Sequence, residues 1–139
     1  MKGKTLLKVT GILMIIGSVI MILTGALGIV GAVEASKYYE TAVLVGMAET
    51  LYILTAASVI CLLAGILELI TGILGVANCA KPEKAKICLI FGIIVIVISV
   101  ASDILMIAGG TEVNVVSLIT GFIVPILYIV GAYLNMKEA

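Results

Sequence analysis

The sequence predicts an all-α protein, a four-helix transmembrane bundle with short loops, and two observations carry that prediction. Hydrophobic residues make up 63% of the 139-residue chain and charged residues only 12%, whereas soluble domains are about 45–50% apolar and about 25% charged. The apolar residues also fall into four runs of roughly 20 to 27 residues, and about 20 residues cross the hydrocarbon core as a helix. An apolar excess of this size cannot be buried inside a body this small, so the bilayer must be its solvent.

The first two runs cover residues 9–33 and 51–77. The first run follows a lysine-rich start, as in a signal peptide, but it is longer than the about 7–15 apolar residues of a signal peptide. We therefore predict that it spans the membrane. Residues 42–49 precede the second run and are apolar up to Glu49. We expect them to extend the second helix beyond the bilayer or to bend away near Glu49.

The third and fourth runs cover residues 87–108 and 115–134, and together the four spans predict a single domain. Lys81-Pro82 marks the end of a loop, and proline favours the first position of a new helix. Gly109-Gly110-Thr111-Glu112 predicts a tight turn between the last two spans. Pro125 removes a hydrogen bond to the carbonyl of Gly121, which predicts a kink in the fourth span.

The lysines predict the orientation of the chain. With four crossings, seven of the eight lysines fall on one side, namely Lys2, Lys4, Lys8, Lys81, Lys84, Lys86 and Lys137, and only Lys37 falls on the other. Lysine is enriched in cytoplasmic loops, so both termini are expected to be cytoplasmic. The same lysines are expected to contact anionic lipid, and we expect no nucleic-acid partner.

Small residues recur every seven positions in the first two runs. Shifted by 47 residues, Thr24-Gly25-Ala-Leu-Gly28 falls on Thr71-Gly72-Ile-Leu-Gly75, which predicts an internal repeat of one helix. Small residues let membrane helices approach closely. We therefore predict a helix-packing stripe formed by Gly17, Ser18, Thr24, Gly25, Ala64, Gly65, Thr71 and Gly72.

Two carboxylates interrupt the spans: Glu68 in the second run and Asp103 in the third. Glu68 lies three residues after Gly65 and four before Gly72, on the face of the small residues. A charged acid in mid-membrane costs about 2.5–3.5 kcal/mol, so both are expected to be protonated, hydrogen-bonded, hydrated or bound to a cation. One interpretation is a proton or cation site. The other is a protonated carboxyl that holds helices together through a hydrogen bond.

Composition excludes several kinds of chemistry. The chain has no histidine and no arginine, and its three cysteines, Cys61, Cys79 and Cys88, form no CxxC motif. We therefore expect no enzyme, catalytic residue, cofactor or metal site. The preferred hypothesis is a multi-pass membrane protein that acts through helix packing, as a homo-oligomer or a small subunit of a larger complex. The alternative is a small proton- or cation-coupled transporter or pore that uses Glu68 and Asp103.

Overall fold

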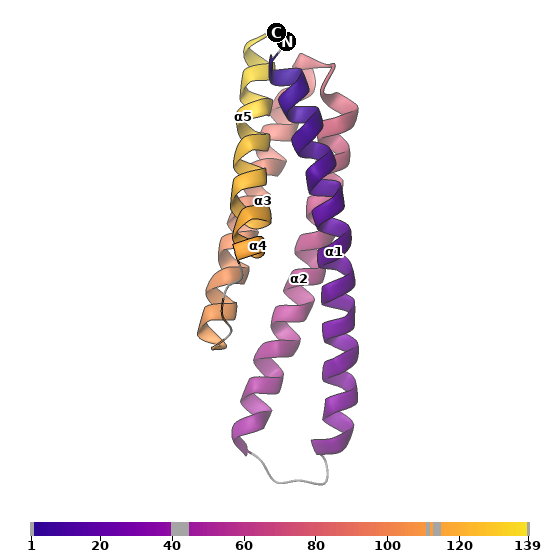
Figure 1. Ribbon diagram of the computed structural model, residues 1–139, viewed down its shortest axis with the longest axis vertical. Coiled ribbons are helices and arrows are strands. Elements are labelled where there is room, and N and C mark those ends of the chain that lie inside the picture. Colours follow the sequence, from indigo (N-terminus) through magenta and orange to yellow (C-terminus); the bar gives the residue numbers. More distant parts are fainter. Residues whose placement is uncertain (1, 40–44, 111, 113–114, 139) are drawn as a thin grey trace.

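The computed structural model describes residues 2–39, 45–110, 112 and 115–138, and its regular elements are all helical (Figure 1). The elements are α1 (Lys2–Tyr39), α2 (Val45–Asn78), the 3-10 turn η1 (Pro82–Lys84), α3 (Ala85–Ala108), α4 (Val115–Leu118), the π-helical turn η2 (Ile119–Ile123) and α5 (Val124–Lys137). The prediction of an all-α fold is confirmed. Residues 40–44, which include the start of the predicted 42–49 extension, lie outside the described residues, as does Thr111.

Three of these helices, α1, α2 and α3, are long and apolar enough to cross a membrane by length and composition. The fourth predicted span corresponds to α4, η2 and α5 in succession, and its apolar helical part, Gly121–Lys137, is shorter. The helices thus indicate a membrane location, while the fourth crossing stays a prediction.

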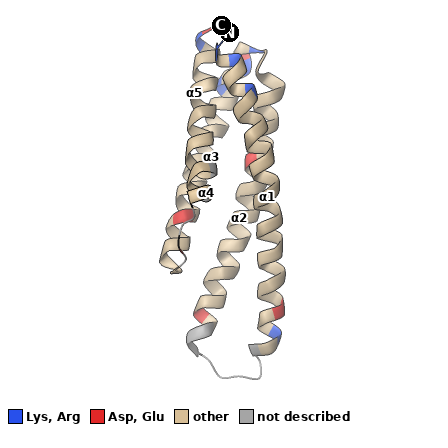
Figure 2. Cartoon of the chain, viewed as in Figure 1, with Lys and Arg blue, Asp and Glu red and all other residues tan. Residues whose placement is uncertain are grey.

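The helices lie side by side, and the chain reverses direction between them (Figure 1). Helix α1 packs against α2, α2 against α3, α3 against α5, and α5 closes onto α1. Both termini lie at one end of the molecule, which we call the terminal end, beside the connection from α2 to α3 (Figure 1). Lysines gather at this end, whereas the charged residues near the opposite, distal end are mainly acidic (Figure 2).

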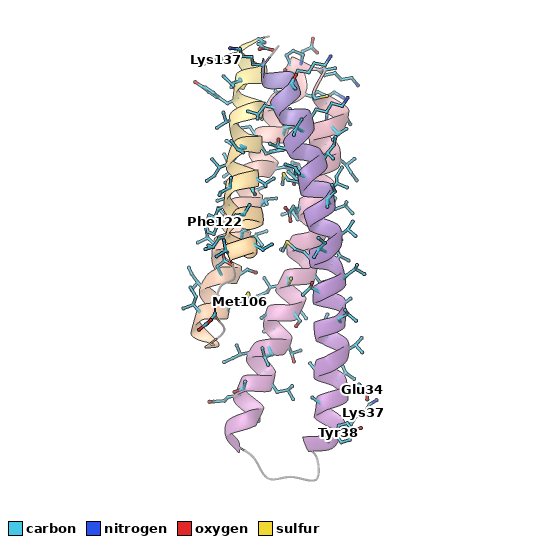
Figure 3. All side chains as sticks on the ribbon, viewed as in Figure 1. Glu34, Lys37, Tyr38, Met106, Phe122 and Lys137 are labelled. Carbon is cyan, nitrogen blue, oxygen red and sulfur yellow. The ribbon has the colours of Figure 1, made fainter. Side chains whose placement is uncertain are left out.

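Helices α1 and α2 extend past the distal end of α3 (Figure 1). Helix α1 has 38 residues and α3 has 24, which at 1.5 Å per residue correspond to about 57 Å and about 36 Å. Helix α2 begins at Val45 and continues through Glu49 without interruption. Of the two alternatives for residues 42–49, the described part therefore follows the extended helix. Glu34, Lys37 and Tyr38 lie at the distal tip of α1 (Figure 3), where Lys37 and Glu34 form an exposed ion pair of 2.7 Å.

Both loop predictions have local explanations in the structure. Lys81 donates its backbone N–H to the Asn78 carbonyl at 2.8 Å, and Pro82 then opens η1, where its missing N–H costs nothing. Helix α3 ends where Gly110 adopts a φ of +75°. Only glycine takes this left-handed conformation without strain, and it is the usual way to end a helix.

The helix around Pro125 accommodates the proline with a π-helical turn. Val124 donates its N–H to the carbonyl of Ile119, five residues earlier. This wider turn ends at Ile123, two residues before Pro125, which has no backbone N–H to donate. Gly121 lies inside the turn. Single π turns of this kind are common at functional sites.

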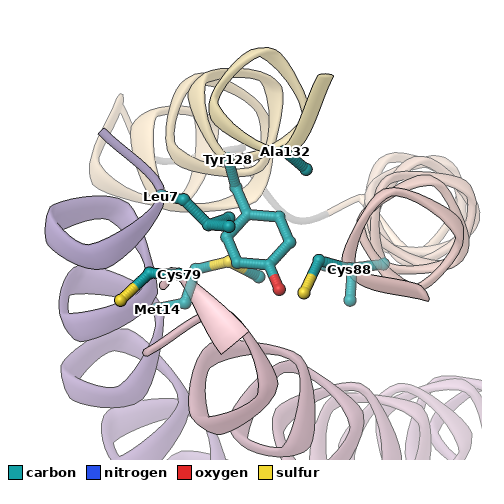
Figure 4. Packing of buried hydrophobic residues seen from close by; sticks show 7 residues of the cluster. Leu7, Met14, Cys79, Cys88, Tyr128 and Ala132 are labelled. Carbon is teal, nitrogen blue, oxygen red and sulfur yellow. The ribbon is translucent and has the colours of Figure 1, made fainter. Parts of the chain in front are cut away.

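The cluster of buried apolar residues lies around Tyr128, in the half of the molecule nearer the terminal end, which we call the terminal half. The Tyr128 ring lies among buried residues from α1, α3, α5 and the turn after α2 (Figure 4): Leu7, Met14, Cys79, Cys88 and Ala132. The Tyr128 hydroxyl donates a hydrogen bond of 2.8 Å to the carbonyl oxygen of Thr71. Nearby, the Asn135 side-chain amide donates to the carbonyl of Cys79 at 3.1 Å. These bonds tie α5 to α2 and to the turn that follows it, because Thr71 lies in α2 and Cys79 directly after its last residue.

Candidate functional site: a cavity between the helices

The small residues of α1 and α2 divide into two lines with different environments. The first line makes backbone contact between the helices. A Cβ atom added at Gly72 would lie 2.8 Å from the carbonyl oxygen of Gly11, and one at Gly25 would lie 2.7 Å from the backbone nitrogen of Leu62. A Cβ at Gly65 would lie 2.9 Å from the side chain of Ile22. The sequence-predicted stripe is therefore used inside the chain at these positions.

The second line borders a cavity of about 240 Å³ between the helices. Gly17 and Thr24 of α1 line it together with Ala57 and Ala64 of α2. A Cβ atom at Gly17 would meet one atom within 4 Å, Oε1 of Glu68 at 3.7 Å. Of the remaining stripe residues, Ser18 and Thr71 are fully buried. The two lines run next to each other along the same helices. One face therefore holds α1 and α2 together, and the adjacent face leaves space.

Helix α3 contributes the polar side of this cavity. Its lining residues are Ser99, Ser102, Asp103 and Met106, whose spacing of three, four and seven places them on one helical face. One carboxyl oxygen of Asp103, Oδ2, is buried and has no hydrogen-bond partner among the described residues. A buried oxygen that lacks a partner loses the solvation it would have in water. Asp103 thus lines the cavity, and its carboxyl group carries one buried oxygen whose hydrogen-bonding capacity is unused among the described residues.

Two serine hydroxyls beside Asp103 are also available. Hydroxyl groups within membrane helices often donate to a carbonyl three or four residues earlier. Among the described side chains seven do so, those of Thr10, Ser18, Thr24, Ser36, Thr55, Ser58 and Thr71. Ser99 and Ser102, in contrast, make no hydrogen bond to any described residue. Their donor capacity is thus free on the face that lines the cavity.

Glu68 lies directly behind the cavity wall. Its side chain is 4% exposed, and it makes no hydrogen bond to any described residue. Its carboxyl approaches the cavity at Gly17, where no side chain intervenes. The sequence predicted both acids as intramembrane groups, and the structure places Asp103 on the cavity and Glu68 beside it.

A further space lies next to this main cavity, toward the distal end. A second cavity of about 150 Å³ shares four lining residues with it, namely Thr24, Ala57, Cys61 and Met106. Its other lining residues include Ile53 and Gly109, near the distal end of α3, and Met106 marks this region in Figure 3. Toward the terminal end the cavities are closed, because the Tyr128 ring fills the space in front of Gly75 and Gly92.

Sequence reasoning missed several residues of this region. Ser102 lies on the same helical face as Ser99 and Asp103, so the helical period of α3 could have revealed it. Tyr128 and Cys61 gave weaker signals, since a lone tyrosine or cysteine in an apolar run has no distinctive pattern. Among the described residues no group of three or more cysteines and carboxylates is placed to hold a metal ion.

These features define a class, a small helical protein whose long apolar helices indicate a membrane location and enclose an acid-lined cavity. The chain matches no protein-family model, no curated protein and no solved structure. Its function must therefore be argued from the geometry of the cavity.

Proposed function

We propose that the chain is a small, non-enzymatic transporter or pore in which Asp103 and Glu68 take up a proton or a cation. One observation carries the proposal: Asp103 lines a cavity between the helices, and one of its carboxyl oxygens is buried without a hydrogen-bond partner among the described residues. This feature favours the alternative hypothesis of the sequence over helix packing alone. At Gly25, Gly65 and Gly72 the predicted packing stripe is occupied by contacts within the chain, so these positions give no separate reason for an oligomer.

The charge balance supports uptake of a positive species. The sequence has no lysine between Lys8 and Lys37 or between Lys86 and Lys137, and it contains no arginine. A carboxylate at this depth therefore has no basic side chain to pair with. An ionised acid surrounded by lipid and protein is costly, so each acid must hold a proton or a cation. Exchange of these species at Asp103 and Glu68 is a minimal transport step.

The decisive experiment compares Glu68→Gln and Asp103→Asn with the unmodified protein in reconstituted vesicles. An amide keeps the shape of a protonated acid but cannot exchange a proton or carry a negative charge. We expect both variants to assemble normally and to lose ion-dependent flux, measured with a pH-sensitive dye under an imposed cation gradient.

The matched control is Glu34→Gln, which removes an exposed acid at the distal tip. This variant should retain full flux. Unchanged flux in Glu68→Gln and Asp103→Asn would reject the proposal.

The proposed topology has four spans with both termini and the connection from α2 to α3 in the cytoplasm. The lysines at the terminal end support this orientation (Figure 2). Labelling tests it in a cysteine-free background, with a membrane-impermeant thiol reagent on intact cells. Ser36→Cys should react from outside, and Lys84→Cys should react only after permeabilisation. The reverse result would invert the topology.

The proposed internal repeat gains support from reciprocal contacts between α1 and α2. Gly25 packs against Leu62. Gly72 lies 47 residues after Gly25, and it packs against Ile15, which lies 47 residues before Leu62. Two copies related by a two-fold axis exchange contacts in this manner. An inverted repeat of this kind is typical of transporters.

A second candidate function, assembly into a homo-oligomer or a larger complex, is favoured by the distal extension of α1 and α2. Exposed apolar side chains continue along it, including Leu27, Val30 and Val33. A hydrocarbon core is about 30 Å thick, much less than the length of α1. Part of this apolar surface would therefore face water unless another protein chain covers it. Mass measurement of the complex extracted in mild detergent tests this candidate. A monomeric mass without associated proteins would exclude it.

A further inference from the structure

The side chains that line the main cavity indicate which kind of cation it would accept. This inference rests on the proposed function. The polar groups gather on α3, where Asp103, Ser99 and Ser102 share one face. The other walls are mainly apolar, with Ile20 and Met21 from α1, although they include the Thr24 hydroxyl, which donates to the Ile20 carbonyl. Methionine side chains adapt to irregular apolar ligands.

Such a wall is poorly suited to a bare inorganic ion. Sodium or potassium in a protein is held by several oxygen atoms, and carboxylate, carbonyl and water oxygens suit hard cations. Here one carboxylate and two hydroxyls occupy one side of the cavity, and mainly hydrocarbon and thioether groups occupy the others, because the Thr24 hydroxyl is already bonded to the Ile20 carbonyl. An organic ammonium ion satisfies both sides, because its charge is compensated by the carboxylate and its alkyl groups contact the apolar side chains.

We propose that the main cavity is a binding site for small organic ammonium ions, with Asp103 as the counter-charge. The volume of about 240 Å³ lies just below the about 300–1,000 Å³ typical of ligand pockets, which limits the ligand to a compact cation. The second cavity borders the main one at Thr24 and Cys61, on the side of the distal end.

Cys61 supplies a built-in reporter for this proposal. It lines both cavities, whereas Cys79 and Cys88 are buried in the terminal half. Small methanethiosulfonate reagents form a disulfide with an accessible thiol and release a sulfinate. They exist in a cationic trimethylammonium-ethyl form, an anionic sulfonato-ethyl form and a neutral hydroxyethyl form. The rate at which Cys61 reacts with each form therefore measures the charge preference of the cavity.

The experiment measures these rates on the full chain in detergent, by peptide mass spectrometry, with each rate divided by that of free 2-mercaptoethanol. We expect the cationic reagent to modify Cys61 on the order of tenfold faster than the anionic one, as a nearby carboxylate would cause. In Asp103→Asn this ratio should fall close to that of an uncharged site. Glu34→Gln should leave it unchanged, and Cys61→Ser should abolish labelling.

Competition tests the same proposal without a substitution. Tetramethylammonium chloride should slow modification of Cys61 by the neutral reagent, and sodium chloride at equal concentration should not. The proposal is overturned if no reagent reaches Cys61, if the cationic and anionic rates are equal, or if Asp103→Asn leaves the ratio unchanged. Equal protection by sodium, together with flux that depends on Asp103, would reject the organic ligand and leave the proposed function standing. Protection by tetramethylammonium without any flux would keep the site and reject transport.

Discussion

The molecule has a terminal half, around Tyr128, and a distal half, around the main cavity. Both are built from α1, α2, α3 and the succession of α4, η2 and α5, and both place glycines where the helices face one another. In the terminal half, Gly75 and Gly92 face Tyr128, the one fully buried aromatic side chain among the described residues, and its ring fills the space between helices. In the distal half, Gly17 and Gly121 face no such group, and a cavity remains. A glycine thus permits either close packing or open space, and the residue opposite decides which.

The two halves also treat their polar groups differently. The terminal half satisfies them, since Tyr128 and Asn135 each bond a backbone carbonyl of another segment. The distal half leaves Asp103 Oδ2 without a partner among the described residues. Buried polar groups are generally hydrogen-bonded in stable proteins, so the terminal half has the properties of a structural core. The distal half retains a buried carboxyl oxygen that this core-like satisfaction does not reach.

The largest expected effect comes from breaking the contact line between α1 and α2, which passes through both halves. Gly72→Leu would place a branched side chain against the backbone of Gly11. We expect a loss of about 3 kcal/mol or more in the free energy of unfolding, measured by SDS titration in mixed micelles. Ile66→Leu, at an exposed position of the same helix, should change it by less than about 0.5 kcal/mol. Similar values for the two variants would show that this line does not hold the helices together.

An intermediate effect is expected for Tyr128→Phe, which keeps the ring and removes the hydroxyl. The hydrogen bond to the Thr71 carbonyl is lost, and such bonds contribute about 0.5–1.5 kcal/mol. The same unfolding titration should show this loss. Tyr133→Phe is the control, because Tyr133 is 44% exposed. Equal stability of both variants would remove the distinction between a closed terminal half and an open distal half.

The smallest expected effect sharpens the comparison most directly, because it uses one substitution in both halves. Gly17→Ala adds a methyl group beside the cavity, where the nearest atom lies at an ordinary contact distance of 3.7 Å. Stability should stay the same or rise by up to about 1 kcal/mol through helix propensity. Gly75→Ala would collide with the Tyr128 ring and should cost about 1–3 kcal/mol. Gly31→Ala, with nothing within 4 Å, should behave like Gly17→Ala; a clear loss in Gly17→Ala would mean that the cavity is closed.

The sequence by itself determined the helical fold class, because long apolar runs bounded by Pro82 and by Gly109-Gly110 leave few alternatives to a helix, while α1 and α2 extend beyond the runs 9–33 and 51–77. It also singled out Glu68 and Asp103, since an acid in an apolar run is conspicuous without any knowledge of its neighbours. The periodicity of small residues identified two lines on α1 and α2, but it assigned both to packing.

Only the tertiary structure decided which of these lines is closed and which is open. Gly25 faces Leu62 across the interface, whereas Gly17 faces space beside Glu68. The difference depends on the residue that a neighbouring helix places opposite each glycine, and periodicity within one helix contains no information about that residue. The same reason applies to Tyr128 and Ser102, whose roles depend on partners 57 residues away along the chain or on a cavity formed by several segments.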